Sequence, residues 1–334
     1  MLLQKIKRAV GRLLEPNQKI RTQRYLAPFP IKMSNTENNK IVEIRRPVIF
    51  VGTARTGTTM VMDMLSGHPD LVPTTGEPER EDVVMWTELG GAIMSAIGKR
   101  NYLGPVGYFY CLPMDETDIS DERIRFFHRE TLRRYPQLGN GKKRLLNANA
   151  HLSNKLLYVK RIFPDASIIF LVRNPYAIVA SMKNKIKNRS NFMFEVPSSI
   201  SSCFNIYPKY EWNSLPQYIS KTNSSVYNPE DVESIRLLAR YWKNIVLYIM
   251  EQSKKLDKDS FMVVRYEDIV SDHEKSISKI LKHCDLAPFN NWAVSPNPEI
   301  NKGRLKELNS KECAIVRDEL GDIIKDFEYE HLLH

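Results

Sequence analysis

Residues 47–59 read PVIFVGTARTGTT, an apolar run followed by two glycines five residues apart. Its apolar, β-branched part, Val48–Val51, predicts a buried strand that ends at Gly52. From Gly57 onward the apolar residues have helical spacing. We therefore predict a strand, a loop bounded by two glycines, and a helix that begins at the second glycine.

The same pattern recurs further along the chain. Ser167–Val172 predicts a second buried strand, and Pro175 suits the first turn of a helix after it. Phe261–Val264 predicts a third strand between helices over about 231–255 and 272–284. Strands that alternate with helices indicate an α/β fold with a largely parallel sheet.

The remaining segments suggest how the chain is organised. We expect residues 1–46 to form a basic amphipathic helix and a linker, and residues 47–334 to form one domain. Two insertions interrupt this domain, a helical one at about 83–140 and a loop at about 188–230 that is rich in Phe, Tyr and Trp. The loop insertion is either a wall of an acceptor site or a packed hydrophobic cluster. The helix over 1–14 either packs on the domain or contacts an anionic bilayer.

Composition limits the class of protein. The 334 residues include 49 Lys and Arg against 39 Asp and Glu, a net charge of +10, and 42% are hydrophobic, enough for a folded core. The basic residues are spread among acidic ones without a zinc-finger or RRM pattern, which favours a small polyanionic ligand over nucleic acid. The four cysteines fit neither a zinc site nor a dense disulfide framework.

The sequence also sets an expectation for where the protein is located in the cell. No run approaches the roughly 18 apolar residues of a membrane-spanning helix. We expect a cytoplasmic protein, with peripheral membrane contact through residues 1–14 as the alternative. A Golgi-lumen location requires that an N-terminal anchor was removed.

The loop after the first strand has the chemistry of an anion site. Gly52 and Gly57 have the spacing of a nucleoside-triphosphate P-loop, but Thr58 stands where that loop has lysine, and Arg55 carries the positive charge. A helix that begins there offers main-chain N–H groups and its positive dipole end. The hydroxyls at the loop are those of Thr56, Thr58 and Thr59. This set favours two linked tetrahedral groups over a triphosphate with metal.

The stretch Val48–Thr59 resembles the 5′-phosphosulfate loop of the sulfotransferase family. Arg173, after the second strand, and Ser181, eight residues later, resemble the family's second motif. The resemblance implies a P-loop-NTPase-like sheet flanked by helices, with 3′-phosphoadenosine 5′-phosphosulfate (PAPS) as donor. It places the 5′ end of the donor on Arg55–Thr59 and the 3′-phosphate on Arg173 and Ser181.

Two further segments resemble parts of the same family. Lys302-Gly303-Arg304 resembles a loop over the nucleotide, which implies that Gly303 and Arg304 bind the donor and that Arg304 adds charge at the 3′-phosphate. The segment 265–268, Arg-Tyr-Glu-Asp, resembles a family segment after a late strand, and we assign it to architecture.

Three residues are candidates for catalysis. Arg55 flanks the loop and is expected to stabilise the leaving phosphate electrostatically, because a guanidinium does not give up a proton at neutral pH. Glu77, in a Gly-Glu-x-x-Arg segment, resembles the proposed base of tyrosylprotein sulfotransferases and related Golgi and bacterial enzymes. His151 is the competing base, although its segment lacks the Lys and Pro of the corresponding family motif.

These observations predict a metal-independent enzyme that moves a sulfuryl group from PAPS to a hydroxyl. A carbohydrate or glycolipid acceptor leads, and small-molecule, lipid and tyrosyl hydroxyls are the alternatives. A P-loop kinase is the second hypothesis, and Thr58 in place of lysine argues against it. A non-catalytic nucleotide-binding protein is the third. The partners expected are a small-molecule donor and a hydroxylated acceptor.

Overall fold

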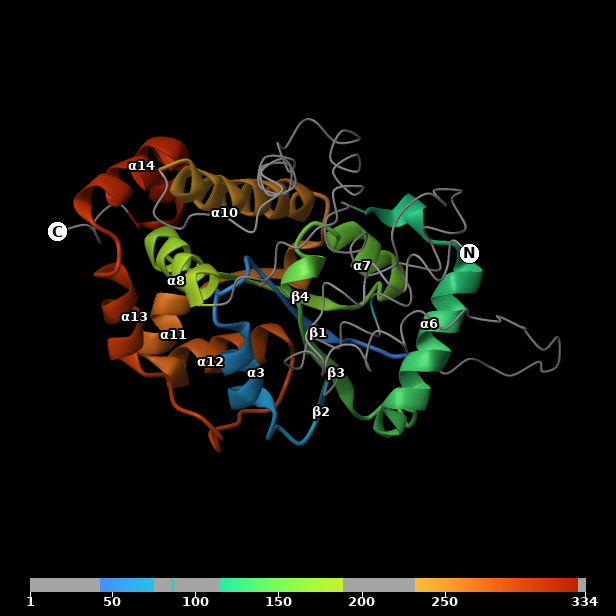
Figure 1. The fold of residues 1–334 in the computed structure, drawn as a ribbon. Helices are drawn as coiled ribbons and strands as arrows, with labels where there is room; N and C mark the ends of the chain where they lie inside the picture. Colours follow the sequence, from blue (N-terminus) through green and yellow to red (C-terminus); the bar gives the residue numbers. More distant parts are fainter. Residues whose placement is uncertain (1–42, 75–85, 87–113, 189–231, 330–334) are drawn as a thin grey trace, which may run out of the picture.

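The computed structural model describes residues 43–74, 86, 114–188 and 232–329 (Figure 1). Among the described helices, none is long and apolar enough to cross a bilayer. Two of the four cysteines lie in this part, and both Cys284 and Cys313 are free thiols. The predicted helix over 1–14 and nearly all of the insertion at 188–230 lie outside the described residues.

Five parallel strands form one sheet in the order β2-β3-β1-β4-β5. The strands are β1 (Val48–Val51), β2 (Leu71–Pro73), β3 (Arg144–Ala148), β4 (Ser167–Val172) and β5 (Phe261–Arg265). β1 lies in the centre, where Val48 is in register with Leu146 of β3 and with Ser167 of β4. The predicted parallel α/β sheet and its three predicted strands are confirmed, while β2 and β3 are additions that the sequence did not predict.

Helices cover both faces of the sheet (Figure 1). One face carries α3 (Thr58–Leu65), α11 (Tyr266–Ser271) and α12 (His273–His283). The other face carries α7 (Leu156–Ile162), α8 (Pro175–Asn188), α10 (Val232–Ser253) and α14 (Ser310–Leu320). Within the described residues, the other α-helices are α6 (Asp121–Arg134), which falls in the predicted helical insertion, and α13 (Pro298–Leu305). The described 3₁₀ segments are η1 (Glu116–Asp118), η2 (Pro136–Leu138), η3 (Ala150–Leu152), η6 (Lys258–Ser260) and η7 (Gly321–Phe327).

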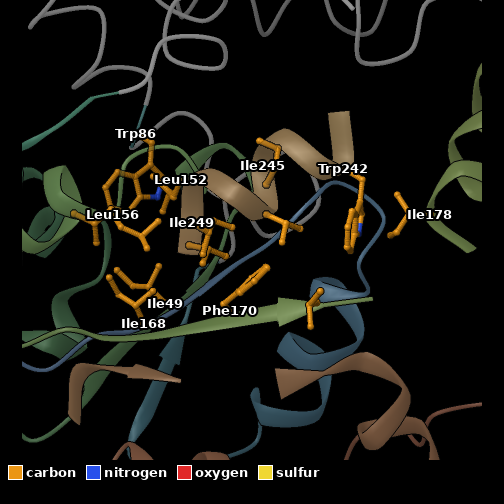
Figure 2. Packing of buried hydrophobic residues seen from close by; sticks show 14 of the residues in the cluster. Ile49, Trp86, Leu152, Leu156, Ile168, Phe170, Ile178, Trp242, Ile245 and Ile249 are labelled. Atoms are coloured by element: carbon orange, nitrogen blue, oxygen red, sulfur yellow. The ribbon is translucent and has the colours of Figure 1, made fainter. Parts of the chain in front are cut away.

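The two faces have separate hydrophobic cores because successive side chains of a strand point to opposite sides. In β4, Ile168 and Phe170 join the core under α10, whereas Ile169 and Leu171 join the core against α3 and α12. Figure 2 shows Ile249 of α10 between the helix and Phe170 of β4. All of these strand side chains are fully buried, so the sheet is a fixed base for the loops at its edge.

Candidate anion-binding site

The sheet topology brings two loops together. β1 and β4 are neighbours and parallel, so the loops that follow them meet at the same edge of the sheet. After β1 the chain enters α3 on one face, and after β4 it enters α8 on the opposite face. In open α/β sheets, ligands bind at the carboxyl ends of two adjacent strands whose following helices lie on opposite faces of the sheet.

The loop after β1 has the backbone that an anion cradle requires. Gly57 is the N-cap of α3 and has φ 101°, a left-handed conformation that glycine adopts without steric cost. A Cβ at Gly57 would also lie 2.5 Å from Cε2 of Tyr266. Both the backbone conformation and the lack of space therefore exclude a side chain at this position. The first intrahelical bond runs from the Val61 amide to the Gly57 carbonyl, 3.3 Å. The amides before Val61 therefore lie at the open, positive end of the helix.

The threonines of the loop divide into two kinds. Thr56 is fully buried, and its hydroxyl donates to the Thr53 carbonyl and lies 2.9 Å from the Thr53 hydroxyl. Contrary to the expectation from sequence, the Thr56 side chain thus supports the loop and does not face an anion. Thr58 is half-buried and Thr59 is exposed, both in the first turn of α3.

The predicted basic residues come together around this loop. Arg173 follows β4, is buried, and donates from Nη1 to the Arg55 carbonyl at 3.0 Å. Arg55 in turn donates from Nε to the Ser181 hydroxyl at 3.2 Å. The guanidinium of Arg173 also stacks 4.2 Å from the ring centre of Tyr266. The two sequence motifs are therefore one connected group of side chains.

Positive charge is concentrated in this group. Burial lowers the pKa of Arg173; Tyr266 and Glu267 oppose this shift, while the charges of Arg304 and Arg55 add to it. The guanidinium groups of Arg55 and Arg304 thus repel that of Arg173. An anion with two charged ends would offset this mutual repulsion.

The structure corrects the expectation for residues 302–304. These residues do not form a loop, because Asn297 caps a helix by accepting from the Glu299 amide at 3.0 Å and Pro298 occupies its first position. Gly303 and Arg304 lie in the last turn of α13. Arg304 donates to both carboxylate oxygens of Glu307, at 2.8 and 3.0 Å.

The structure describes the two candidate bases only in part. Glu77 lies outside the described residues. The backbone of His151 belongs to η3, directly after β3. This segment is bonded to the loop after β1, since the Ser153 hydroxyl accepts from the Gly52 amide at 2.9 Å and donates to the Gly52 carbonyl at 2.7 Å.

Three aromatic residues support the site, and only Tyr266 among them lies in the segment that the sequence assigned to architecture; roles for Tyr241 and Trp242 were not predicted. Tyr266 packs on Gly57 and Arg173, as described above. Tyr241 accepts from the Ala54 amide at 3.2 Å, and Trp242 donates from its indole to the Arg173 carbonyl at 3.1 Å. Glu267, beside Tyr266, has the architectural role expected, since it accepts from the Asn174 amide at 3.1 Å and the Tyr329 hydroxyl at 2.9 Å.

A parallel sheet with a glycine-bounded loop at a helix start and arginines around it defines a P-loop-like α/β protein with a candidate anion-binding site. Residues 47–207 and 212–291 match the model of the sulfotransferase family, so the chain belongs to this family.

The chain is similar to several known proteins at low sequence identity. A protein-tyrosine sulfotransferase of Drosophila melanogaster is 23% identical over 289 residues, which are 86% of this chain and 46% of the relative. Nodulation protein NoeE of Sinorhizobium fredii is 25% identical over 245 residues, 72% of this chain and 50% of the relative. The chain spans about half the length of these two relatives. The sulfotransferase domain from the curacin biosynthetic pathway has a TM-score of 0.45 at 13% identity, covering 86% of this chain and 99% of that domain.

Proposed function

We propose that the protein transfers a sulfuryl group from PAPS to a hydroxyl of an acceptor. The observation that carries the proposal is the connected group of Arg55, Arg173 and Ser181 at the start of α3, with the charge of Arg304 nearby. A site with positive charge on two sequence motifs suits a nucleotide that is charged at both its 5′ and 3′ positions. Membership in the sulfotransferase family supports the same assignment.

The residues fit the two ends of such a donor. The amides at the start of α3, with Thr58, Thr59 and Arg55, would hold the 5′-phosphosulfate, because a helix N-terminus favours anions. Arg173, Ser181 and Arg304 would hold the 3′-phosphate.

The chemistry asked of the protein is positioning and charge stabilisation. PAPS supplies a sulfuryl group bonded to a phosphate oxygen; that sulfur–oxygen bond breaks as the acceptor oxygen bonds to sulfur. Arg55 and the α3 amides stabilise the charge that develops on the phosphate. The acceptor proton passes to a base, for which we propose Glu77 ahead of His151.

For the acceptor we propose a tyrosyl hydroxyl first. The Drosophila relative is named for protein tyrosine, and two further relatives, from Caenorhabditis elegans and Danio rerio, carry similar names. The carbohydrate or glycolipid acceptor rests on the aromatic residues of the 188–230 insertion, all of which lie outside the described residues. It is the second candidate.

An acceptor screen with radiolabelled PAPS tests the proposal. We expect label to enter a tyrosine-containing peptide or, failing that, a glycan. Glu77→Gln should abolish transfer while leaving the affinity for adenosine 3′,5′-bisphosphate within about twofold, and His151→Asn serves as the matched variant. If His151→Asn is inactive and Glu77→Gln is active, the base is His151. If no hydroxylated acceptor is labelled, the proposed transfer is wrong.

Metal independence is a separate prediction. A sulfuryl group carries less charge than a phosphoryl group, so arginines and helix amides replace the role that Mg²⁺ plays in kinases. We expect transfer to continue in excess EDTA. Strict Mg²⁺ dependence, or transfer of label from γ-labelled ATP, would instead favour a kinase.

A further inference from the structure

Arg55 is held in a conformation that side chains usually avoid. Its φ is 72°, within the left-handed region. A residue with a Cβ persists there only where its surroundings hold it, and such residues cluster at functional sites. The direction of the Arg55 guanidinium and of the amides that follow depends on this conformation.

Hydrogen bonds fix the backbone on both sides of Arg55. The amide of the preceding residue, Ala54, donates to the Tyr241 hydroxyl at 3.2 Å. The carbonyl of Arg55 itself accepts from Nη1 of Arg173 at 3.0 Å. One of these partners belongs to the donor site described above, but Tyr241 belongs to α10 and has no assigned role.

Helix α10 is well suited to hold a hydroxyl in place. Trp242, the next residue, is fully buried and donates to the Arg173 carbonyl. Arg240, the residue before, donates to both carboxylate oxygens of Glu319 on α14, at 2.7 and 3.1 Å. Three consecutive residues thus bond to three different parts of the protein, which fixes the rotation of the helix.

We infer that Tyr241 is a positioning residue for the donor site: its hydroxyl, together with Arg173, holds Arg55 in the left-handed conformation that forms the anion cradle. The inference rests on the proposed function. It also assigns the Ala54 amide to the protein and not to the anion. The Thr56 amide is likewise bonded within the protein, to the Thr53 carbonyl at 3.3 Å, so the cradle is made by amides after Ala54 other than that of Thr56.

Calorimetric titration with adenosine 3′,5′-bisphosphate and with adenosine 5′-monophosphate tests the inference. Tyr241→Phe keeps the ring and removes the hydroxyl that the Ala54 amide uses. We expect about tenfold weaker binding of both nucleotides, the loss typical of one hydrogen bond to a buried group. Binding of both nucleotides should weaken because both place a 5′-phosphate in the cradle. If Tyr241 had a purely structural role, the substitution would lower thermal stability without weakening nucleotide binding in this way. Tyr248→Phe, two turns further along α10, is the matched control and should bind like the wild type.

Hydrogen exchange gives a second measurement on the unaltered protein. The Ala54 amide should exchange slowly in the wild type and faster in Tyr241→Phe. If the wild type binds the bisphosphate but Tyr241→Phe binds it equally well, or if the wild-type Ala54 amide is unprotected, the role of Tyr241 is wrong and the proposed function is untouched. If the wild type does not bind the bisphosphate, the proposed function itself fails.

Discussion

Arg173 connects several parts of the site through one side chain and its carbonyl. Its guanidinium donates a hydrogen bond to the Arg55 carbonyl and stacks on the Tyr266 ring. Its carbonyl accepts a hydrogen bond from the Trp242 indole. A buried arginine fixed by this many contacts is pre-organised, so little side-chain entropy would be lost if it bound a phosphate.

Substitution of Arg173 should reveal its two roles. Arg173→Ala removes the charge for a 3′-phosphate and the bond to the Arg55 carbonyl. We expect binding of adenosine 3′,5′-bisphosphate to weaken about 100-fold, and binding of adenosine 5′-monophosphate much less, as measured by calorimetry. Arg173→Lys, which keeps the charge, should fall between. Equal losses for the two nucleotides would reject the 3′-phosphate assignment.

Gly57 is constrained by both conformation and space. Gly57→Ala places a Cβ in a left-handed residue and within 2.5 Å of the Tyr266 ring. The conformation alone costs about 1–2 kcal/mol. We expect a lower free energy of unfolding in denaturant titrations and loss of nucleotide binding, because the ring or the helix start must move. Wild-type stability with wild-type affinity would contradict the loop geometry.

At the scale of elements, α13 shows why one part of the site was predicted wrongly. Residues 302–304 contain glycine between basic residues, which is typical of a loop, yet the cap at Asn297 and the proline after it start a helix that includes them. Local composition favoured a turn, and the helix signal lay five residues upstream.

Gly303→Ala tests this placement. A Cβ at Gly303 meets no atom within 4 Å, and the residue is helical and exposed. Alanine should therefore raise the free energy of unfolding by about 0.5–1 kcal/mol. A fall in stability would indicate a backbone conformation that only glycine adopts.

His128 links three segments and predicts a pH dependence. Its Nδ1 accepts from the Ile44 amide at 3.1 Å, and its Nε2 lies 3.0 Å from the Ile162 carbonyl, so the neutral imidazole with a proton on Nε2 satisfies both. Burial lowers the pKa of His128, against the opposing effect of the bond to Ile162. The folded state thus binds this proton less readily than the unfolded state.

The free energy of unfolding should fall as pH drops below about 6.5, the ordinary histidine pKa, because the unfolded chain then takes up the proton first. The contribution of His128 is fully present above that pH. Urea titrations at about pH 7.5 and about pH 5.5 should show a larger decrease for the wild type than for His128→Gln. Burial also lowers the pKa of His283, which is present in both proteins and cancels in the comparison. An equal decrease would contradict the assignment.

The strands β2 and β3 were not predicted from the sequence, each for its own physical reason. β2 has only three residues, too few for a periodic pattern. β3 contains Arg144 and Asn147, which are buried because distant parts of the chain supply their partners: Arg144 donates to the Arg46 and Cys284 carbonyls, and Asn147 donates to the Thr74 hydroxyl at 3.0 Å. Such partners are invisible in a local stretch of sequence.

For the whole molecule, the adjacent strands β1, β4 and β5 were predicted from the sequence, whereas β3 and β2 on the other side of β1 were not. β1, β4 and the helices after them were predicted because their apolar side chains are buried on both faces of the sheet and their loops contain glycine or proline. The same stretches carry Arg55, Arg173 and Ser181, so sequence analysis could predict most of the site. The supporting residues Tyr241 and Trp242 could not be predicted, because they reach the loops only through the packing of α10 against the sheet.

Calorimetric titration of the wild-type protein with adenosine 3′,5′-bisphosphate, with ATP as comparison, distinguishes the proposed donor site from a triphosphate site. The proposed function assigns to the arginines and the start of α3 a nucleotide that is charged at both its 3′ and 5′ positions. The bisphosphate should therefore bind well below millimolar concentration, in EDTA, and more tightly than ATP. No heat of binding up to millimolar bisphosphate, or tighter binding of ATP, would contradict it.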